Sequence, residues 1–354
     1  MSGKKKGHCR FSSLMRNKKV VGKRIVGLGV ICLFLALCTG CSQQTGEKPS
    51  SAQPGMAPAD ENGKTEDGVS EEAETSADKE GSRVWAAKVL VPEAPGTEVY
   101  GEGEILLDVS NASEGYVMLN YNGSNSKVKF QVTTPEEVTY TYTVTEYGSY
   151  KAYPLPGGDG NYGLTVYEVA SEEKNLYAVA LAQEIAVSIP NRLKTFLYPN
   201  CYVEFDASSA CVKKGEELAK GCDTDLDVVA SVYGYVTENI SYDYDKAETV
   251  QPGYAPFPDN TLAAGTGICF DYASLMAAML RSQQIPTRLE VGYVGDLYHA
   301  WLSCYIDEKG WVDDIIEFDG NGWTMMDPTM ASSGGSKEVL RLEEESGYIT
   351  KYVY

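Results

Sequence analysis

The sequence predicts an α+β protein in which an all-β part precedes a part that mixes helices and strands. Two observations carry this prediction. Residues 84–190 contain short alternating segments separated by turn residues, and two long helical patterns follow residue 190. About 270 residues remain after residue 83, which suits two domains. We therefore expect a β-rich domain over 84–190 and a second domain over 191–354.

The β-rich domain is expected to be an Ig-like sandwich of short antiparallel strands. Asn122-Gly123 and Pro156-Gly157-Gly158 are typical of the turns between such strands. Seven tyrosines lie between residues 140 and 167, and tyrosine in a strand more often packs than binds, although a glycan- or peptide-binding face is the alternative. The expected strands are 85–91, 104–109, 116–121, 127–132, 138–146, 161–169 and 176–189.

Two helices are predicted in the second domain. The first covers 223–240, where apolar residues recur at helical spacing after a polar start at Asp223-Thr224-Asp225. The second covers 269–283 and is apolar around most of its circumference, so we expect it to be buried beside the first. Residues 244–264 are predicted to form a loop that borders a groove. Strands are expected over 287–294, 298–306 and 323–327.

Cys269, His299 and Asp327 are the residues that indicate chemistry. Cys269 follows a glycine-rich stretch at a predicted helix start, where free backbone N–H groups favour a thiolate. His299 comes 30 residues later, Asp327 a further 28, and His299 is the only histidine after His8. A thiol, an imidazole base and an orienting carboxylate together suit acyl transfer. A buried structural cysteine and a packed core histidine are the alternatives. Three other acids compete as the orienting group: Asp313, Asp314 and Asp319.

Three motifs resemble those of the transglutaminase-like superfamily, a branch of the papain-like fold. They are the segments GICFDYA at 267–273, YHAW at 298–301 and MDPT at 326–329. The resemblance covers roughly residues 195–330 and implies catalytic roles for Cys269, His299 and Asp327. It also implies that an upstream side chain helps to form an oxyanion hole, and Tyr242 is the candidate, beside the backbone N–H of Cys269. Because the superfamily spans transglutaminases, peptidases, amidases and inactive scaffolds, it leaves the reaction open.

The N-terminal segment 1–41 resembles a bacterial lipoprotein signal. Residues 1–40 hold nine Lys or Arg and no acid, and an apolar run from Ile25 to Leu37 is short for a membrane span. Cys41 would be the lipid-attachment residue, and an uncleaved signal anchor is the alternative. Residues 42–83 have few bulky apolar side chains, so they are expected to form a disordered tether. This predicts an exported protein, lipid-anchored on the extracytoplasmic face of the membrane.

Charge and cysteine usage restrict the partners. The net charge is −20, and loss of the nine basic residues would make it −29, which argues against nucleic acid or anionic lipid. No cofactor or metal site is expected, because paired ligand spacings and a phosphate-binding glycine loop are missing from the sequence. Cys304 is expected to be buried and free, whereas the pairing of Cys201, Cys211 and Cys222 stays open.

Together these features predict a thiol enzyme that performs acyl transfer or hydrolysis on amide bonds of proteins or wall peptides. The competing hypothesis is a non-catalytic surface binding or scaffold protein that uses the same fold without turnover.

Overall fold

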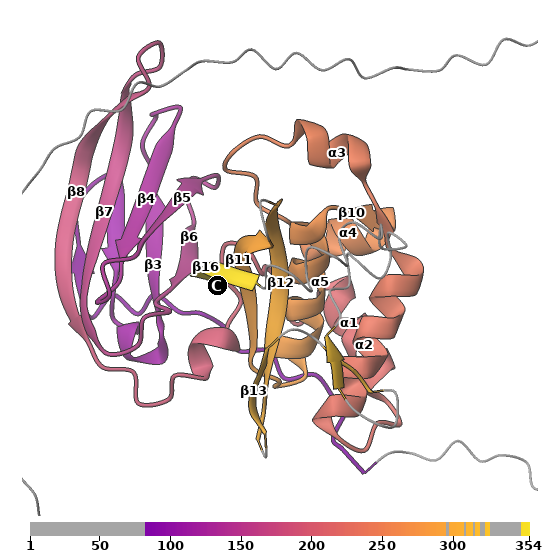
Figure 1. Ribbon diagram of the computed structural model, residues 1–354. Helices are drawn as coiled ribbons and strands as arrows, with labels where there is room; N and C mark the ends of the chain where they lie inside the picture. Colours follow the sequence, from indigo (N-terminus) through magenta and orange to yellow (C-terminus); the bar gives the residue numbers. More distant parts are fainter. Residues whose placement is uncertain (1–81, 295–296, 308, 314–315, 319–322, 326–347) are drawn as a thin grey trace, which may run out of the picture. The chain divides into compact units, whose positions relative to one another are not determined.

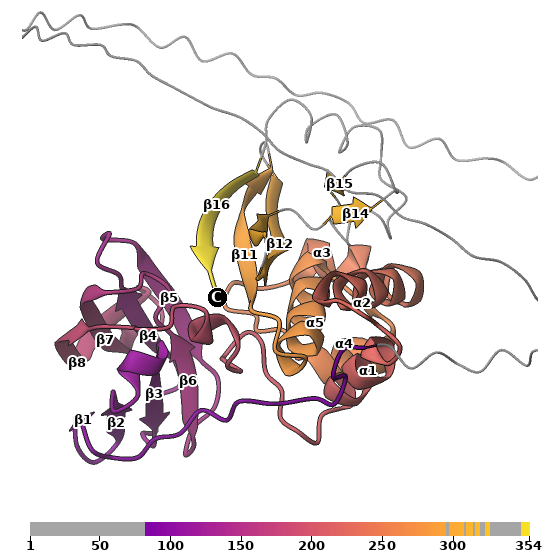
Figure 2. The same ribbon diagram turned by 90° about the horizontal axis from the view of Figure 1, so that it is seen from below.

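A computed structural model describes residues 82–294, 297–307, 309–313, 316–318, 323–325 and 348–354 (Figures 1 and 2). These residues all belong to one compact unit of the chain. The predicted signal segment, Cys41 and nearly all of the predicted tether lie outside the described residues, as does Asp327. Among the described helices, none is both long and apolar enough to cross a membrane.

The β-rich part consists of two four-stranded antiparallel sheets. One has the order β1 (Val99–Tyr100), β2 (Ile105–Asp108), β3 (Tyr116–Tyr121), β6 (Tyr150–Pro154). The other has the order β5 (Thr139–Val144), β4 (Val128–Thr133), β7 (Gly160–Ser171), β8 (Leu176–Val187). Alternate side chains of β4 and β5 are buried, as half-buried strands require.

Aromatic side chains fill the space between these two sheets. The ring of Phe130 on β4 packs edge-on against Tyr153 on β6, with centroids 4.8 Å apart. Tyr140, Tyr142 and Tyr162 are also buried, so most of the tyrosines in this region have the packing role that was expected. The β-rich character is confirmed, whereas the Ig-like label stays a prediction.

The prediction of a strand over 85–91 is wrong. These residues are extended but pair with no strand, and the segment crosses the helices of the second part, as the indigo trace in Figure 2 shows. The Lys88 N–H donates to the Ser282 carbonyl (2.8 Å), and the Ala87 N–H donates to the Glu216 carboxylate (2.8 Å). The strand was predicted from the alternation of apolar and polar residues. In the structure, helices rather than a sheet cover the apolar residues. We call residues 82–91 the strap.

The second part is built around helix α5 (Cys269–Ser282) and the antiparallel sheet β13 (Gly310–Asp313), β12 (Leu297–Ile306), β11 (Thr287–Val294), β16 (Tyr348–Val353). α5 packs against β11 and β12 and also against α1 (Ala210–Ala219), α2 (Asp225–Asn239) and α4 (Pro258–Ala264). It is therefore covered on several sides, which explains why nearly all of its residues are buried and most of them are apolar. Both predicted long helices are confirmed.

Local signals explain where α2 begins. The Thr224 side chain accepts a hydrogen bond from the Asp227 N–H, and the Asp227 carboxylate accepts one from the Thr224 N–H. This reciprocal arrangement satisfies two N–H groups that the first turn leaves free. Beyond the helix, β9 (Ser241–Tyr242) pairs in parallel with β10 (Thr266–Gly267), which brings the end of α2 next to the start of α5.

The prediction that 244–264 is entirely loop is wrong. Two short helices lie within it, α3 (Tyr244–Thr249) and α4, separated by residues 250–257. Asp243 caps α3 by accepting from the Lys246 N–H, and Pro258 occupies the first turn of α4, where its missing N–H costs nothing. A capping acid and a first-turn proline were helix signals in a stretch that was assigned to a loop because it contains several prolines.

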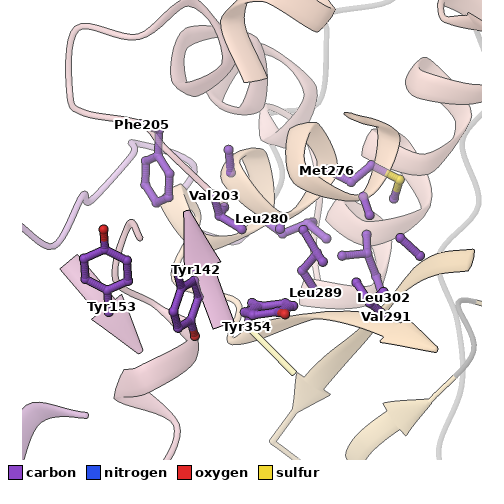
Figure 3. Packing of buried hydrophobic residues seen from close by; sticks show 14 of the residues in the cluster. Tyr142, Tyr153, Val203, Phe205, Met276, Leu280, Leu289, Val291, Leu302 and Tyr354 are labelled. Atoms are coloured by element: carbon purple, nitrogen blue, oxygen red, sulfur yellow. The ribbon is translucent and has the colours of Figure 1, made fainter. Parts of the chain in front are cut away.

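The two parts share one hydrophobic core. Figure 3 shows Tyr142 of β5 near Tyr354, which lies beside β11, while Leu280 of α5 and Leu289 of β11 continue the same cluster. The rings of Tyr142 and Tyr354 lie 5.9 Å apart. A domain boundary near residue 190 stays a prediction. The five described cysteines are free, and Cys304 is buried as expected.

Candidate active site

Cys269 is the first residue of α5, as predicted. Gly265 ends α4 with φ of +63°, a conformation that glycine adopts readily, and β10 then leads directly into the helix. A Cβ at Gly267 would lie 2.6 Å from the Cβ of Asp271, so only glycine allows the strand to approach the first turn this closely. Cys269 thus lies in the first turn of the helix, where backbone N–H groups have no partner within the helix.

Asp271, two residues further along, ties three segments to this helix start. Its buried carboxylate accepts from the Ile268 N–H (2.8 Å), pairs with the Lys246 ammonium (2.7 Å) and accepts from the Tyr254 hydroxyl. Burial acts to lower the pKa of Lys246, but hydrogen bonds to Asp271 and Tyr254 outweigh it, so this pKa lies above its ordinary value. Asp271 therefore holds residues 244–254 beside Cys269. Sequence reasoning missed this role, although the acid at the third helical position was a capping signal.

His299 lies near the start of β12, opposite Gly292 of β11. A Cβ at Gly292 would meet the Ile349 carbonyl oxygen at 2.0 Å, so this glycine allows β16 to pack closely where its register with β11 shifts. The imidazole is almost fully buried and stacks on Trp301 with centroids 6.3 Å apart. The strand that carries this imidazole, β12, packs against α5.

One cavity of about 1060 Å³ brings together three of the predicted site residues, Cys269, His299 and Tyr242. Tyr242 reaches it from β9, where it pairs with Gly267, and its ring contacts those of Tyr244 and Tyr272. Residues 247 and 250–254 also line this cavity, so the prediction that this stretch borders a groove is confirmed.

Of the candidates for the orienting acid, only Asp313 has a described backbone. Asp313 lies on β13 and pairs with Ser303 of the neighbouring strand β12. Ser303 is four positions after His299 on that strand (303 − 299). Asp314, Asp319 and Asp327 lie outside the described residues.

Tyr298, the residue before His299, lines the same cavity and is more than half exposed. Burial, followed by the charges of Tyr352, Tyr293 and Cys269, raises the pKa of its hydroxyl above its ordinary value. Partial burial and neighbouring acidic groups both disfavour the ionised form of this hydroxyl.

The β-rich part supplies part of the cavity wall, which sequence reasoning missed. The lining residues from this part are Lys127, Val128, Lys129, Thr141, Thr143, Asn175 and Tyr177. They lie on β4, β5 and β8 or directly before β4 and β8, and they belong to no motif. Only the packing of the two parts reveals that they line the same cavity as Cys269.

Comparisons with known proteins agree with the motifs. Residues 213–328 match the model of the transglutaminase-like superfamily. A curated relative, the UPF0252 protein MJ1282 of Methanocaldococcus jannaschii, is 27% identical over 156 residues. That match covers 41% of this chain and 42% of the relative, so the chain spans less than half of the relative's length.

Two solved structures show weaker similarity. A candidate cysteine protease from Cytophaga hutchinsonii is 18% identical, with a TM-score of 0.33 and coverage of 68% of this chain and 72% of that chain. Red sea bream transglutaminase is 13% identical, with a TM-score of 0.25 and coverage of 60% and 48%. Neither similarity is strong enough to bear on activity. The family match and the α/β arrangement around Cys269 agree, and residues 213–328 therefore form a transglutaminase-like domain.

Proposed function

We propose that the protein is a thiol enzyme that transfers or hydrolyses the acyl group of peptide amides. The observation that carries this proposal is the shared cavity of Cys269, at the first turn of α5, and His299, on β12. A thiol and an imidazole facing one space, in a chain with no other histidine beyond His8, match the needs of a nucleophile and its base.

In the proposed reaction, His299 takes the proton of the Cys269 thiol, and the thiolate sulfur attacks the carbonyl carbon of the amide. The tetrahedral intermediate collapses, the C–N bond breaks, and His299 gives its proton to the departing amine. A thioester remains on Cys269. Water or a primary amine then attacks that thioester with His299 again accepting the proton, which releases an acid or a new amide.

Two further residues have supporting roles in this proposal. Tyr242 donates its hydroxyl hydrogen to the developing oxyanion, together with the backbone N–H of Cys269. Its place in the same cavity supports this role. Asp327, which the MDPT motif suggests, orients the imidazole and stabilises its protonated form.

The proposed location is the extracytoplasmic face of a membrane, with a lipid on Cys41 and residues 42–83 as a tether. The basic and then apolar N-terminal sequence supports it. Substrates at that location are amide bonds of surface proteins or wall peptides.

The experiment is an assay of purified protein lacking residues 1–41 with a glutamine-containing peptide as amide donor, with and without a primary amine. Ammonia release that needs Cys269 establishes acyl transfer, and incorporation of the amine distinguishes transfer from hydrolysis. Cys269→Ala is the control. If wild type and Cys269→Ala release equal amounts of ammonia while the peptide still binds, the scaffold alternative holds instead.

A further inference from the structure

We infer that the β-rich wall of the cavity is a subsite for a carboxylate of an acidic peptide substrate, and that Lys129 determines this specificity. The inference rests on the proposed function for the reacting end of the substrate. It adds the chemical class of the substrate and assigns the β-rich part a role in choosing it.

The charge of the cavity is opposite to that of the chain. The chain contains 50 acidic and 30 basic residues. Yet the described residues that line the cavity include two lysines, Lys127 and Lys129, and no aspartate or glutamate. A cationic recess in an acidic protein concentrates anionic ligands, because low-dielectric walls focus the field.

Lys129 is the better placed of the two lysines. Lys127 is exposed and pairs with Glu172 at 3.2 Å, so its charge is largely compensated. Lys129 is half-buried, its ammonium lies 4.2 Å from the centre of the Tyr177 ring, and no carboxylate among the described residues pairs with it. A cation held over an aromatic face keeps its charge while its stem is fixed. A substrate carboxylate therefore gains a charge-assisted hydrogen bond there.

The spacing between Lys129 and Cys269 is fixed by the chain itself. Lys129 pairs with Thr143 of β5. A Cβ at Gly253 would lie 2.4 Å from the Thr143 hydroxyl oxygen, so Gly253 lies against the β-rich part at the residue that pairs with Lys129. The next residue, Tyr254, is held to the start of α5 through Asp271. Contacts thus run continuously from the lysine wall to the cysteine wall.

The remaining lining suits a peptide. Seven tyrosines and the Thr141 and Thr143 side chains offer ring faces and hydroxyls for an extended backbone. A nucleic acid is disfavoured, because its many phosphates would meet a chain of net charge −20 and only two lysines. One or a few carboxylates match the number of cations available.

The test uses chloroacetyl tetrapeptides that alkylate Cys269, with sulfur replacing chloride. The probes are made in pairs, and the two members of a pair differ only in having Glu or Gln at one of the four positions. Alkylation requires only that the Cys269 thiol is accessible, so the measurement remains valid even if the protein turns over no amide. For wild type lacking residues 1–41, we expect the Glu probe to react about tenfold more efficiently than the Gln probe at the best position. The preference should shrink as salt rises.

In Lys129→Gln the ratio should fall to about one, and in Lys129→Glu it should invert. Lys220→Gln is the matched control, since Lys220 lies over the Trp85 ring at 5.8 Å and outside the cavity, and it should keep the wild-type ratio. Unchanged urea-unfolding midpoints show that the variants are folded. Equal reaction of Glu and Gln probes with wild type at all positions, or a Glu preference that survives in Lys129→Gln, would overturn the inference.

Discussion

Cys269 owes its position to backbone features on both sides of it. Gly265 turns the chain out of α4, Gly267 allows β10 to approach the helix, and Asp271 caps the first turn. A mutation at any of these three residues would displace the thiol without removing it. They are positioning residues, and the carboxylate of Asp271 also anchors one wall of the cavity through Lys246 and Tyr254.

Tyr242 provides a prediction at this scale. Tyr242→Phe should lower kcat for amide turnover by about 100-fold with little change in KM, because an oxyanion donor acts on the intermediate rather than the substrate. Tyr244→Phe is the matched control, since its exposed ring contacts Tyr242 and it does not line the cavity. The rate of Cys269 alkylation should be the same in both variants. A kcat for Tyr242→Phe within twofold of wild type would exclude the hydroxyl as an oxyanion donor.

The sequence could reveal Cys269, His299 and Tyr242, because each lies in or near a local motif with a chemical reason behind it. It could not reveal Lys129 or Tyr177, which lie on strands without any motif and reach the cavity only through packing. Asp271 lies between these cases. Its capping position was visible, but its partners Lys246 and Tyr254 are 25 and 17 residues away.

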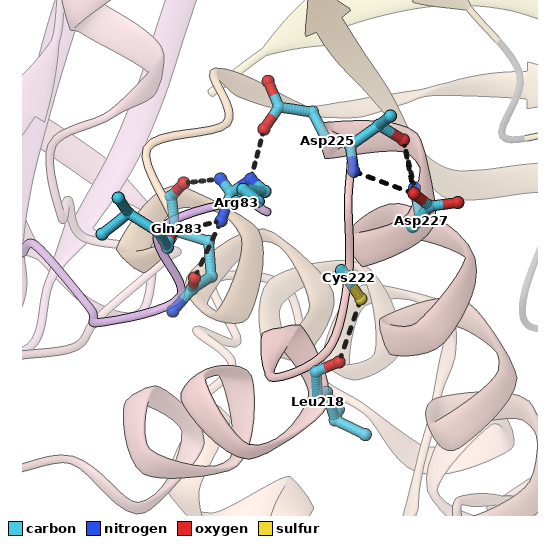
Figure 4. A network of polar contacts seen from close by, with 8 residues as sticks. Arg83, Leu218, Cys222, Asp225, Asp227 and Gln283 are labelled. Carbon is cyan, nitrogen blue, oxygen red and sulfur yellow. Dashed lines mark hydrogen bonds and ion pairs between the residues drawn. The ribbon is translucent and has the colours of Figure 1, made fainter. Parts of the chain in front are cut away.

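At the scale of elements, α5 and β11–β12 were predictable because apolar periodicity and length agree with the burial that the structure gives them. The strap was not predictable, since alternation of apolar and polar residues alone cannot distinguish a strand from an extended segment that crosses helices. Figure 4 shows how the strap is fixed: the Arg83 guanidinium reaches both Asp225 of α2 and Gln283 at the end of α5. One side chain thus joins the strap to both long helices.

Arg83→Ala should destabilise the protein by about 1–3 kcal/mol, because a largely buried guanidinium leaves a carboxylate and a carbonyl without their donor. Urea unfolding followed by circular dichroism measures the effect. Arg192→Ala removes an ion pair between two side chains that are each more than half exposed, so it should cost within about 0.5 kcal/mol. Equal losses for the two variants would mean that the strap contributes nothing beyond an ordinary surface contact.

At the scale of the molecule, the β-rich part and the transglutaminase-like part share a core rich in buried tyrosine. Tyr140 and Tyr142 of β5 contact Tyr354, and Tyr202 contacts both Tyr354 and Phe270, the residue after Cys269. The composition change near residue 190 indicated two parts, but no periodicity in either part indicated a shared aromatic core. The cavity walls are therefore held in place by packing that spans both parts.

This aromatic core predicts a loss of stability at high pH. Burial raises the pKa of Tyr140 to about 12 and those of Tyr142 and Tyr153 well above the ordinary value. Above pH 10 the unfolded chain releases these protons while the folded protein keeps them, so stability falls as pH rises, by about 1.4 kcal/mol per pH unit for each such tyrosine. Urea-unfolding midpoints should be level from pH 7 to 9 and fall steeply beyond pH 10. Tyrosinate absorbance that appears fully before the fold is lost would contradict this account.

The central claim is that Cys269 and His299 act as a pair, and the rate of iodoacetamide labelling of Cys269 against pH tests it most directly. His299 is the only imidazole beyond His8, so no other side chain readily replaces it near neutral pH. In wild type, labelling should already be fast near neutral pH, because the helix start and the protonated imidazole favour the thiolate. In His299→Ala, labelling near neutral pH should slow, and the profile should shift towards that of a free thiol. Superimposable profiles for the two proteins would show that the residues are uncoupled and would contradict the catalytic account.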